Sequence, residues 1–287
     1  MSVPNVSEGV DEAAITVIGE AFAPARLLNV HSDPDHHRSV FTLVSKQGEL
    51  ARALANGAAA VHARVDVSAH EGIHPHVGAI DVVPVVYLAP DQRGAACAEA
   101  LTAADLIARR TGTPVFLYGE LAGGRERAEL RAGGIKGLAE RIASGEHRPD
   151  FGPTELHPSA GATLVSARPP LVAFNVDLAD GESLDTARAI AAELRESGGG
   201  LPGVRAIGLW LEARGRAQVS CNVQDPFNVA LAEVVAFVRA RAAIENAELI
   251  GLAPKAAFTD FPDDVEIPGF DPTEHLLENV IGDLERN

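Results

Sequence analysis

The sequence contains few cysteines, few aromatic residues and a shortage of basic residues. Of 287 residues only Cys97 and Cys221 are cysteine, and they lie far apart, so a disulfide framework is excluded and a cytoplasmic location is expected. The 24 Lys and Arg against 40 Asp and Glu give a formal net charge of −16. That charge argues against nucleic acid and membrane as partners, because both favour a basic surface.

Long apolar runs are also missing. No stretch approaches the roughly 18 apolar residues of a membrane span, and the first residues show no basic segment followed by an apolar one, so neither a membrane helix nor a secretory signal is expected. Hydrophobic residues still make up 46% of the chain, which allows a sizeable core. At roughly 100–150 residues per domain, the length predicts two domains.

One order of strands and helices occurs twice along the chain. In the first half, strands are predicted at 3–6, 26–30, 39–45 and 80–88, with helices at 11–23 and 48–64. In the second half, strands are predicted at 171–177, 206–212, 217–223 and 248–253, with helices at 184–196 and 226–241. This split βαβ order predicts an α+β fold, a tandem repeat of two ferredoxin-like subdomains with mixed sheets and helices on one face.

The subdomain boundaries are expected at 1–165 and 166–287, and the second subdomain includes an acidic tail. We expect that tail, after residue 257, to be loosely attached and to end in a short helix at 273–284. Between the repeats, the pattern predicts a helix at 92–111, a strand at 114–118 and a basic helix at 125–143. The Gly- and Pro-rich segment 144–161 is interpreted as the loop that connects the halves. The basic helix, which includes Arg127 and Arg131, could attract a carboxylate substrate, although such a helix is more often a solvated face.

Histidines give the clearest chemical signal. Seven of the ten precede residue 77, and six of these lie in the segments 31–38 and 70–81. One imidazole could serve as a general base with a pKa near neutrality. Alternatively, a zinc-like ion could be bound by His31, Asp33, His70, His74 and His76, although no CxxC or HExxH motif supports a metal. A further reading, that polar loops merely happen to contain histidines, is weakened because two such loops occur.

A second candidate is the segment 150–163, whose glycines and prolines would bring backbone amides close to a ligand. From composition alone, an interdomain linker explains it better. The sequence has no Walker A loop, no Rossmann glycine fingerprint and no GxSxG elbow, which disfavours nucleotide hydrolysis and the serine hydrolases.

Several motifs in chain order resemble one family. They are VPNVSEG (3–9), HSDPDHHRSVFTLV (31–44), HEGIHPHVGAIDVVP (70–84), YGE (118–120), DFGPTELHPSAGAT (150–163), LVAFNVDL (171–178), AQVSCNV (217–223) and ELIGLAPKAA (248–257). Together they resemble the formiminotransferase family, which comprises glutamate formimidoyltransferase and the formiminotransferase domain of formiminotransferase-cyclodeaminase. The resemblance implies two ferredoxin-like subdomains and transfer of a formimino group from N-formimino-L-glutamate to N5 of tetrahydrofolate. It also implies tetrahydrofolate as co-substrate, no metal, and no cyclodeaminase activity without another protein.

The resemblance also assigns residues. It places the catalytic histidine at His74, which is expected to act as a general base. It places a folate-binding loop at Gly152, Pro153, Thr154, Glu155, Leu156, His157, Pro158, Ser159, Ala160 and Gly161. Further candidates for binding substrate or orienting the base are His31, Asp33, Arg38, His70 and His76. The partners expected are these small molecules, and a homodimer is left open.

Two positions depart from the family pattern. His76 stands where the family has arginine, and His37 stands where asparagine is usual. Arginine would be a permanent cation for a substrate carboxylate, whereas histidine is only partly charged near neutrality. The alternatives are therefore a related folate enzyme that uses an N-formyl or 5-formyl-folate substrate, a metal-dependent hydrolase, and a folate-binding protein without catalysis.

Overall fold

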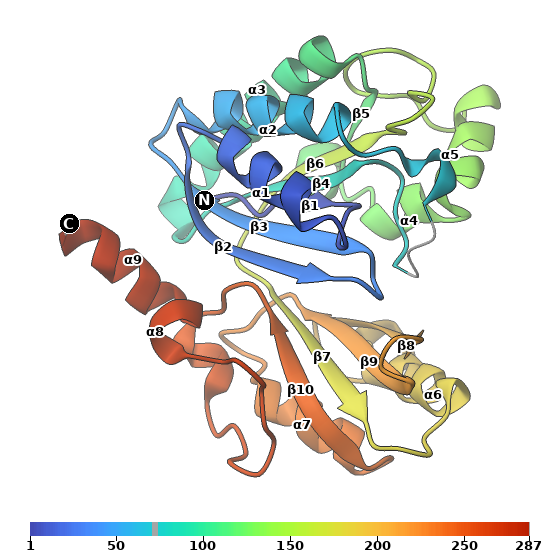
Figure 1. Ribbon diagram of the computed structural model, residues 1–287, viewed down its shortest axis with the longest axis vertical. Helices are drawn as coiled ribbons and strands as arrows, with labels where there is room; N and C mark the ends of the chain where they lie inside the picture. Colours follow the sequence, from blue (N-terminus) through green and yellow to red (C-terminus); the bar gives the residue numbers. More distant parts are fainter. Residues whose placement is uncertain (71–73, 287) are drawn as a thin grey trace. The chain divides into compact units, whose positions relative to one another are not determined.

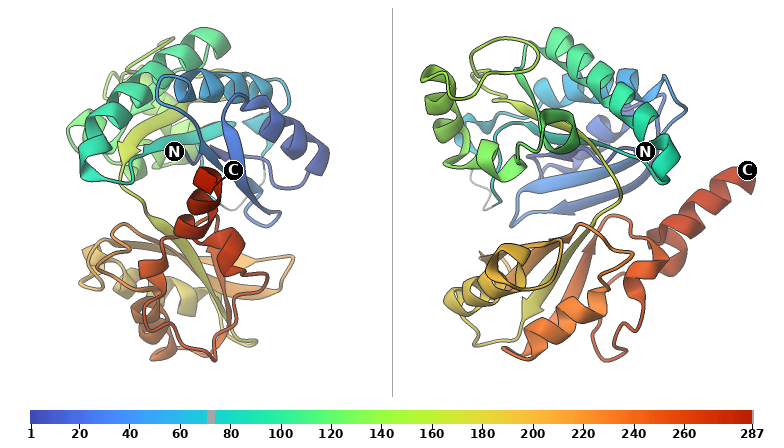
Figure 2. Two further views of the ribbon diagram at one scale, coloured as in Figure 1. Left: turned by 90° about the vertical axis from the view of Figure 1, so that its left-hand side faces the viewer. Right: turned by 180° about the vertical axis from the view of Figure 1, so that it is seen from behind.

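A computed structural model describes residues 1–70 and 74–286 and divides the chain into two compact units. Unit 1 comprises Met1–Arg168 and unit 2 comprises Pro169–Asn287. Figures 1 and 2 show that each unit is a sheet with helices packed against it. Within the described residues, no helix is long and apolar enough to cross a membrane.

Unit 1 contains a six-stranded sheet in the order β2-β3-β1-β4-β6-β5. Its strands are β1 (Asn5–Val6), β2 (Arg26–Asp33), β3 (Arg38–Val44), β4 (Ile80–Val86), β5 (Val115–Leu117) and β6 (Thr163–Arg168). Its helices are α1 (Glu12–Ala21), α2 (Leu50–His62), α3 (Arg93–Thr111), α4 (Arg127–Arg131) and α5 (Gly134–Ala143). The first four strands pair antiparallel, and β6 pairs parallel with both β4 and β5.

Unit 2 contains a four-stranded antiparallel sheet in the order β10-β7-β9-β8. Its strands are β7 (Val172–Leu178), β8 (Val204–Leu211), β9 (Arg216–Val223) and β10 (Ile244–Ile250). Its helices are α6 (Leu184–Leu194), α7 (Leu231–Arg239), α8 (Pro272–His275) and α9 (Leu277–Arg286). In both units the first strand lies between the third and the fourth, and the second pairs with the third. The α+β fold and the repeated element order are thus confirmed, although the sheet is mixed only in unit 1.

The strand β6 is the main element that the sequence analysis lacked. It lies inside the sheet between β4 and β5, and five of its six residues are buried. A strand buried on both sides shows no alternation of polar and apolar residues, so its pattern is weak. Because 144–161 precedes β6, that segment is a loop within unit 1, and its interpretation as the connection between the halves is wrong.

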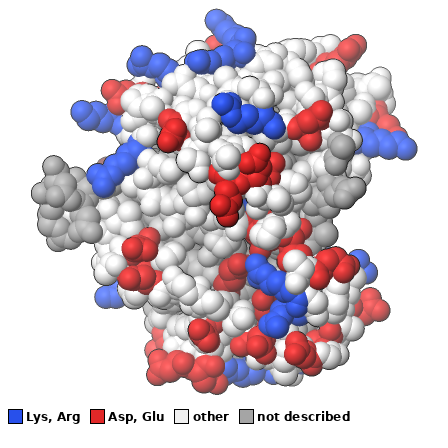
Figure 3. Space-filling model, viewed as in Figure 1, with Lys and Arg blue, Asp and Glu red and all other residues white. Residues whose placement is uncertain are grey.

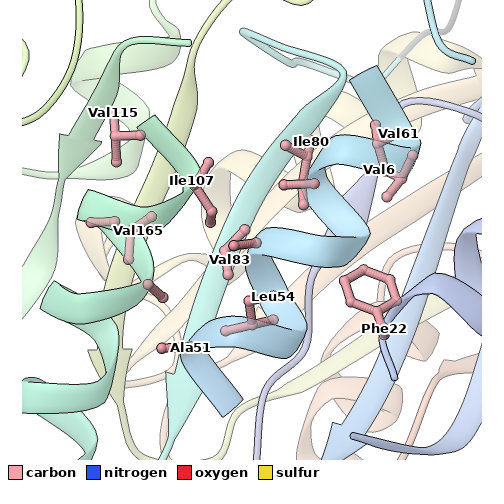
Figure 4. Packing of buried hydrophobic residues seen from close by; sticks show 14 of the residues in the cluster. Val6, Phe22, Ala51, Leu54, Val61, Ile80, Val83, Ile107, Val115 and Val165 are labelled. Carbon is pink, nitrogen blue, oxygen red and sulfur yellow. The ribbon is translucent and has the colours of Figure 1, made fainter. Parts of the chain in front are cut away.

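The main core of unit 1 lies between the sheet and helices α1, α2 and α3. Figure 4 shows side chains of α2 and α3, such as Leu54 and Ile107, directed at side chains of the sheet, such as Val83 and Val165. In β4, β5 and β6, neighbouring residues point to opposite faces because side chains alternate along a strand. Some residues of these strands therefore belong to a second cluster.

That second cluster lies on the other face of the sheet and includes side chains of α4 and α5. Leu130 of α4 and Leu138 of α5 are fully buried there with Phe116. The predicted helix 125–143 is in fact two helices, because Gly133 and Gly134 take φ angles of 71° and 62° and interrupt it. Unit 1 therefore carries helices on both faces, not on one.

In unit 2 the core lies between the sheet and helices α6 and α7, and the acidic tail adds to it. Phe258, Phe261 and Phe270 pack against the buried cluster of that unit. Backbone bonding continues into the tail, where Ala247 N donates to Glu266 O at 2.9 Å. The expectation of a loosely attached tail is therefore wrong, because its aromatic residues are part of the core.

Candidate active site

Three of the sequence motifs meet in unit 1 because β1 lies between β3 and β4. Ser7 Oγ donates to Gly78 O at 2.9 Å, and Ser39 Oγ donates to Glu8 O at 2.5 Å. A Cβ at Gly9 would lie 2.3 Å from a backbone oxygen of the 33–38 turn, so only glycine fits that approach. The segments 3–9, 31–44 and 74–84 thus form one cluster; residues 71–73 of the third motif lie outside the described part of the chain.

The buried carboxylate of Asp81, on β4, is the centre of this cluster. Its side chain is 0% exposed and accepts a hydrogen bond from Arg38 Nη2 at 2.9 Å. Arg131 Nη2 donates to the same carboxylate oxygen, and Val77 N donates to the other one at 2.9 Å. Burial alone would raise the pKa of Asp81, but the two arginines and the amide outweigh it and lower the pKa to about 2.

Arg38, at the start of β3, joins this carboxylate to His74. Its Nε donates to Asn5 Oδ1 at 3.0 Å, and its Nη1 lies 3.0 Å from His74 Nδ1. Burial lowers the pKa of Arg38, and Asp81 opposes that shift. The guanidinium stays charged at neutral pH, because the usual pKa of arginine is far above 7.

The Nδ1 atom of His74 has two neighbours that require different tautomers. Arg38 Nη1 lies at 3.0 Å and can only donate, whereas Pro75 O lies at 2.9 Å and can only accept. With Nδ1 unprotonated, the ring accepts from Arg38 and carries its proton on Nε2. With Nδ1 protonated, the ring donates to Pro75 O, and Nε2 is an available base.

The surroundings keep His74 neutral. Burial is the largest cause that lowers its pKa well below 6.5, and Arg38 and Arg131 lower it further. Both arginines are permanent cations, so a third positive charge on the ring is disfavoured. At pH 7 the imidazole is therefore unprotonated and ready to accept a proton, but it holds that proton weakly.

Four other histidines of the two segments have ring contacts with one another or with His74. The ring of His70 lies 4.4 Å from the rings of both His37 and His76, and the ring of His36 lies 5.8 Å from that of His74. Burial and the two neighbouring rings lower the pKa of His70 to about 4. Burial also lowers the pKa of His76. At neutral pH, His76 therefore provides no cation in place of arginine.

The turn between β2 and β3 explains two further residues. Asp33 Oδ1 accepts the amide proton of His36 at 2.7 Å, so Asp33 fixes the turn. His31 lies on β2 opposite Val40. His37 has a φ of 48°, a left-handed conformation that asparagine and histidine adopt more readily than most residues. This backbone requirement accounts for histidine where asparagine is usual.

The end of the loop 152–161 packs against the segment that follows His74. Ala79 N donates to Ala160 O, and Ala162 N donates to Val77 O, both at 2.9 Å. The first four residues of this loop, 152–155, are exposed. They are open to a ligand, whereas the last ones are backbone partners of 77–79.

His157, within this loop, has contacts that stabilise the loop itself. Its Nδ1 accepts the amide proton of Ala160 at 3.2 Å, and its ring lies edge-on to His62 at 4.3 Å. Two reciprocal backbone bonds also join His157 and Gly161. The observed role of His157 is therefore to hold the turn.

Gly78→Ala tests this backbone packing. A Cβ at Gly78 would lie 1.9 Å from Ala162 O, so we expect a loss of about 1–3 kcal/mol in the free energy of unfolding, or more. Urea denaturation measures it. Gly94→Ala in α3 is the matched control, because a Cβ there meets nothing within 4 Å and alanine favours a helix. Equal stability of both variants would contradict the close contact.

The set of ligands considered for a metal is not assembled in the structure. Within residues 1–70 and 74–286, no group of three or more His, Cys, Asp or Glu side chains is arranged to hold a metal ion. His31, Asp33, His70, His74 and His76 therefore form no such group, and the geometry gives the metal-dependent hydrolase no support.

Two functional neighbours of His74, Asn5 and Asp81, were not singled out by the sequence analysis, although both lie inside the quoted motifs. Arg131 was named there as part of the basic helix that could attract a carboxylate, but its pairing with Asp81 was not predicted. Asp81 could have been found from the sequence, because it lies within a run of apolar strand residues. A carboxylate in such a strand is buried, and a buried charge is paired. Figure 3 shows basic and acidic side chains interspersed on the face drawn, with no broad basic field there. The positive charge around His74 belongs instead to buried arginines.

Comparison with known proteins identifies the family of this chain. The model of the formiminotransferase domain, N-terminal subdomain, matches residues 1–168, and the model of the formiminotransferase domain matches residues 173–263. The chain therefore belongs to the formiminotransferase family.

Curated relatives carry the same family names. A glutamate formimidoyltransferase of Streptococcus pyogenes is 37% identical, with 96% of each chain covered. A glutamate formimidoyltransferase of Thermoplasma acidophilum is 32% identical, with 90% of this chain and 89% of the relative covered. A formimidoyltransferase-cyclodeaminase of Sus scrofa is 37% identical over 90% of this chain, which spans 50% of that relative.

Proposed function

We propose that this protein transfers the formimino group of N-formimino-L-glutamate to N5 of tetrahydrofolate and releases glutamate. The observation that carries the proposal is a neutral His74 beside Arg38 and Arg131, in a chain of the formiminotransferase family. Relatives that share the length of this chain are named glutamate formimidoyltransferases. Tetrahydrofolate enters as a co-substrate, and no metal takes part in the scheme.

The proposed reaction needs one proton carrier. N5 of tetrahydrofolate attacks the formimino carbon, and His74 Nε2 accepts the N5 proton as the new N–C bond forms. This step uses the tautomer whose Nδ1–H donates to Pro75 O. The imidazolium then gives its proton to the glutamate nitrogen as the old C–N bond breaks, and the neutral ring is restored. Two reactants held in one site gain much of their rate from proximity.

The two arginines favour the second step. An imidazolium beside Arg38 and Arg131 is destabilised, because all three groups are positive. The ring is therefore a weak base but its conjugate acid readily releases the proton. Expulsion of glutamate as an amine requires that proton, so the low pKa of His74 suits the leaving group more than the nucleophile.

For the folate, the proposed contact is the loop 152–161. Its exposed part, 152–155, offers backbone amides that no secondary structure uses, and its end is fixed against 77–79. Gly152 takes a φ of 82°, and a Cβ there would lie 2.8 Å from Thr113 O, so the chain begins this loop, directly after Phe151 bonds to β5, at a position that requires glycine. The cytoplasmic location and the homodimer stay predictions.

A direct assay tests the proposal. Purified protein is mixed with tetrahydrofolate and N-formimino-L-glutamate, and the product is cyclised with acid to methenyl-folate, whose absorbance is followed. Product above a control without protein supports the transferase. If tetrahydrofolate binds in a titration and no product forms, the donor is different, and N-formyl and 5-formyl-folate substrates are assayed next. If neither binding nor product is found, the proposal is wrong.

The pH dependence of kcat/KM is a second test. Because the pKa of His74 is lowered well below 6.5, the free enzyme keeps its base unprotonated at pH 6.5. We expect kcat/KM to change by less than about twofold between pH 7.5 and 6.5, with the acidic limb at lower pH. Substrate protonation is measured separately and subtracted. An acidic limb centred at the ordinary histidine pKa would contradict the assignment.

A further inference from the structure

Arg131 has more hydrogen-bond donors than the described protein groups use. Its side chain is 9% exposed, and a guanidinium offers five N–H donors. In the described part of the chain, its one hydrogen bond runs from Nη2 to Asp81, and its Nε is buried without a partner. A buried donor without an acceptor costs free energy, so the protein retains Arg131 at a cost.

The charges around Arg131 do not balance. Arg38 and Arg131 both donate to the one carboxylate of Asp81, and His74 beside them is neutral at pH 7. Arg127, on the same short helix as Arg131, adds further positive potential at Arg38 and His74. Arg38, Arg131 and Asp81 by themselves therefore carry an excess of one positive charge. An anionic ligand would neutralise it.

We infer that Arg131 binds a carboxylate of the glutamyl donor. This inference rests on the proposed function. Arginine binds carboxylates through charge-assisted N–H bonds, and Arg131 still has its Nε–H and its Nη1 donors for such bonds. The family has arginine at position 76, but His76 is neutral at pH 7. Arg131, on helix α4, would supply the cation that His76 lacks.

The connection between Arg131 and His74 favours a carboxylate of the donor, and not one of the folate, as the ligand of Arg131. Asp81 is shared by Arg131 and Arg38, and Arg38 contacts His74, so Arg131 is connected to the base through the Asp81 carboxylate and the Arg38 guanidinium. In the donor, the α-carboxylate is attached to the carbon that bears the leaving nitrogen. In folate, the p-aminobenzoyl group separates the glutamyl carboxylates from N5. A folate carboxylate is the competing source, and the experiment separates the two.

The test combines truncated substrates with variants of Arg131. The wild type, Arg131→Gln and Arg131→Lys are each assayed with N-formimino-glutamate and with its two monoamides, which lack one carboxylate each. They are also assayed with tetrahydrofolate and with tetrahydropteroate, which lacks the glutamyl tail. Arg109→Gln is the matched control, because that arginine is 76% exposed and pairs with Asp105 on the same helix.

We expect Arg131→Gln to lower kcat/KM for the donor by about 10- to 100-fold, since a hydrogen bond to a charged group is lost. The KM for tetrahydrofolate should change by less than about twofold. One monoamide should be as poor a substrate for the wild type as the intact donor is for Arg131→Gln. That variant should no longer discriminate between the acid and this amide. Arg131→Lys should keep part of the discrimination, and Arg109→Gln all of it.

Two results overturn the inference. If Arg131→Gln and Arg131→Lys still discriminate between the acid and the amide as well as the wild type does, Arg131 does not contact the donor carboxylate. Loss of discrimination between tetrahydrofolate and tetrahydropteroate instead assigns Arg131 to the folate tail. If Arg131→Gln does not fold, the kcat/KM values of Arg131→Lys and of the wild type with the two monoamides decide whether Arg131 binds the donor carboxylate. If the wild type is inactive with every donor, the proposed function is wrong. That result is distinct from a failure of the Arg131 assignment, which requires an active wild type.

Discussion

His74→Ala is expected to lower kcat by about 10²–10⁴-fold, the usual effect of removing a general acid-base group. The ring is held by Arg38 on its Nδ1 side, and burial together with the charges of Arg38 and Arg131 keeps it neutral. Turnover is measured with the methenyl-folate assay at saturating substrates. Thermal unfolding of the variant is measured in parallel, to show that it is folded.

The control for this variant is His147→Ala, a histidine of the loop after α5. If both variants keep wild-type turnover, His74 is not the base. If His74→Ala is slow, added imidazole should restore part of the rate, because the missing group is a proton carrier. A slow variant that imidazole does not rescue, and whose melting temperature also falls, would point to a structural role instead.

Asp81→Asn should produce the largest loss of stability, about 3–5 kcal/mol in the free energy of unfolding. The substitution keeps the shape but leaves Arg38 and Arg131 buried with no negative partner. Urea denaturation at pH 7 measures the change. Asp105→Asn is the matched control, since Asp105 forms an exposed pair with Arg109 and should cost less than about 1 kcal/mol. Similar losses in both variants would contradict the buried pairing.

The pH dependence of stability gives an independent check on Asp81. Its pKa is about 2 in the folded protein, below the usual 3.9 or so of an unfolded aspartate. The ionised group therefore contributes stability that is fully present above pH 4 and is lost as the pH falls toward 2. Asp81→Asn has no group to protonate, so the difference between it and the wild type should shrink over that window. A constant difference would mean that Asp81 does not titrate as described.

Strands with a clear apolar pattern could be predicted from the sequence, including the fully buried β4, whereas β6 could not. The hairpin of β8 and β9 was predicted within a few residues, because its apolar residues alternate and a Gly-containing turn separates them. In β6, no such alternation exists, since both of its faces are covered. The break between α4 and α5 was missed because glycine within a helical pattern does not reveal its φ angle.

Some residues of the site could likewise be predicted from the sequence, and others could not. His74 was singled out because its segment resembles a known family, and Arg38 was a candidate for substrate binding or orientation within the motif 31–44. Asp81 and Arg131 act through charge pairing across 50 residues of sequence, and no local pattern reports such a pair. The folate loop stays a prediction, since the structure explains the contacts of its end but not a ligand.

The position of β6 also determines when the site can form during synthesis. On the ribosome, His74 and β4 emerge early, but the parallel partner of β4 emerges only after α3, β5, α4 and α5. Until then, β4 presents an apolar edge that is open to other chains, and long-range parallel pairing is slow. A nascent chain stalled before Thr163 therefore carries His74, Asp81 and Arg131 without the strand that completes their sheet. We expect slow translation between β4 and β6 to prolong that unpaired state.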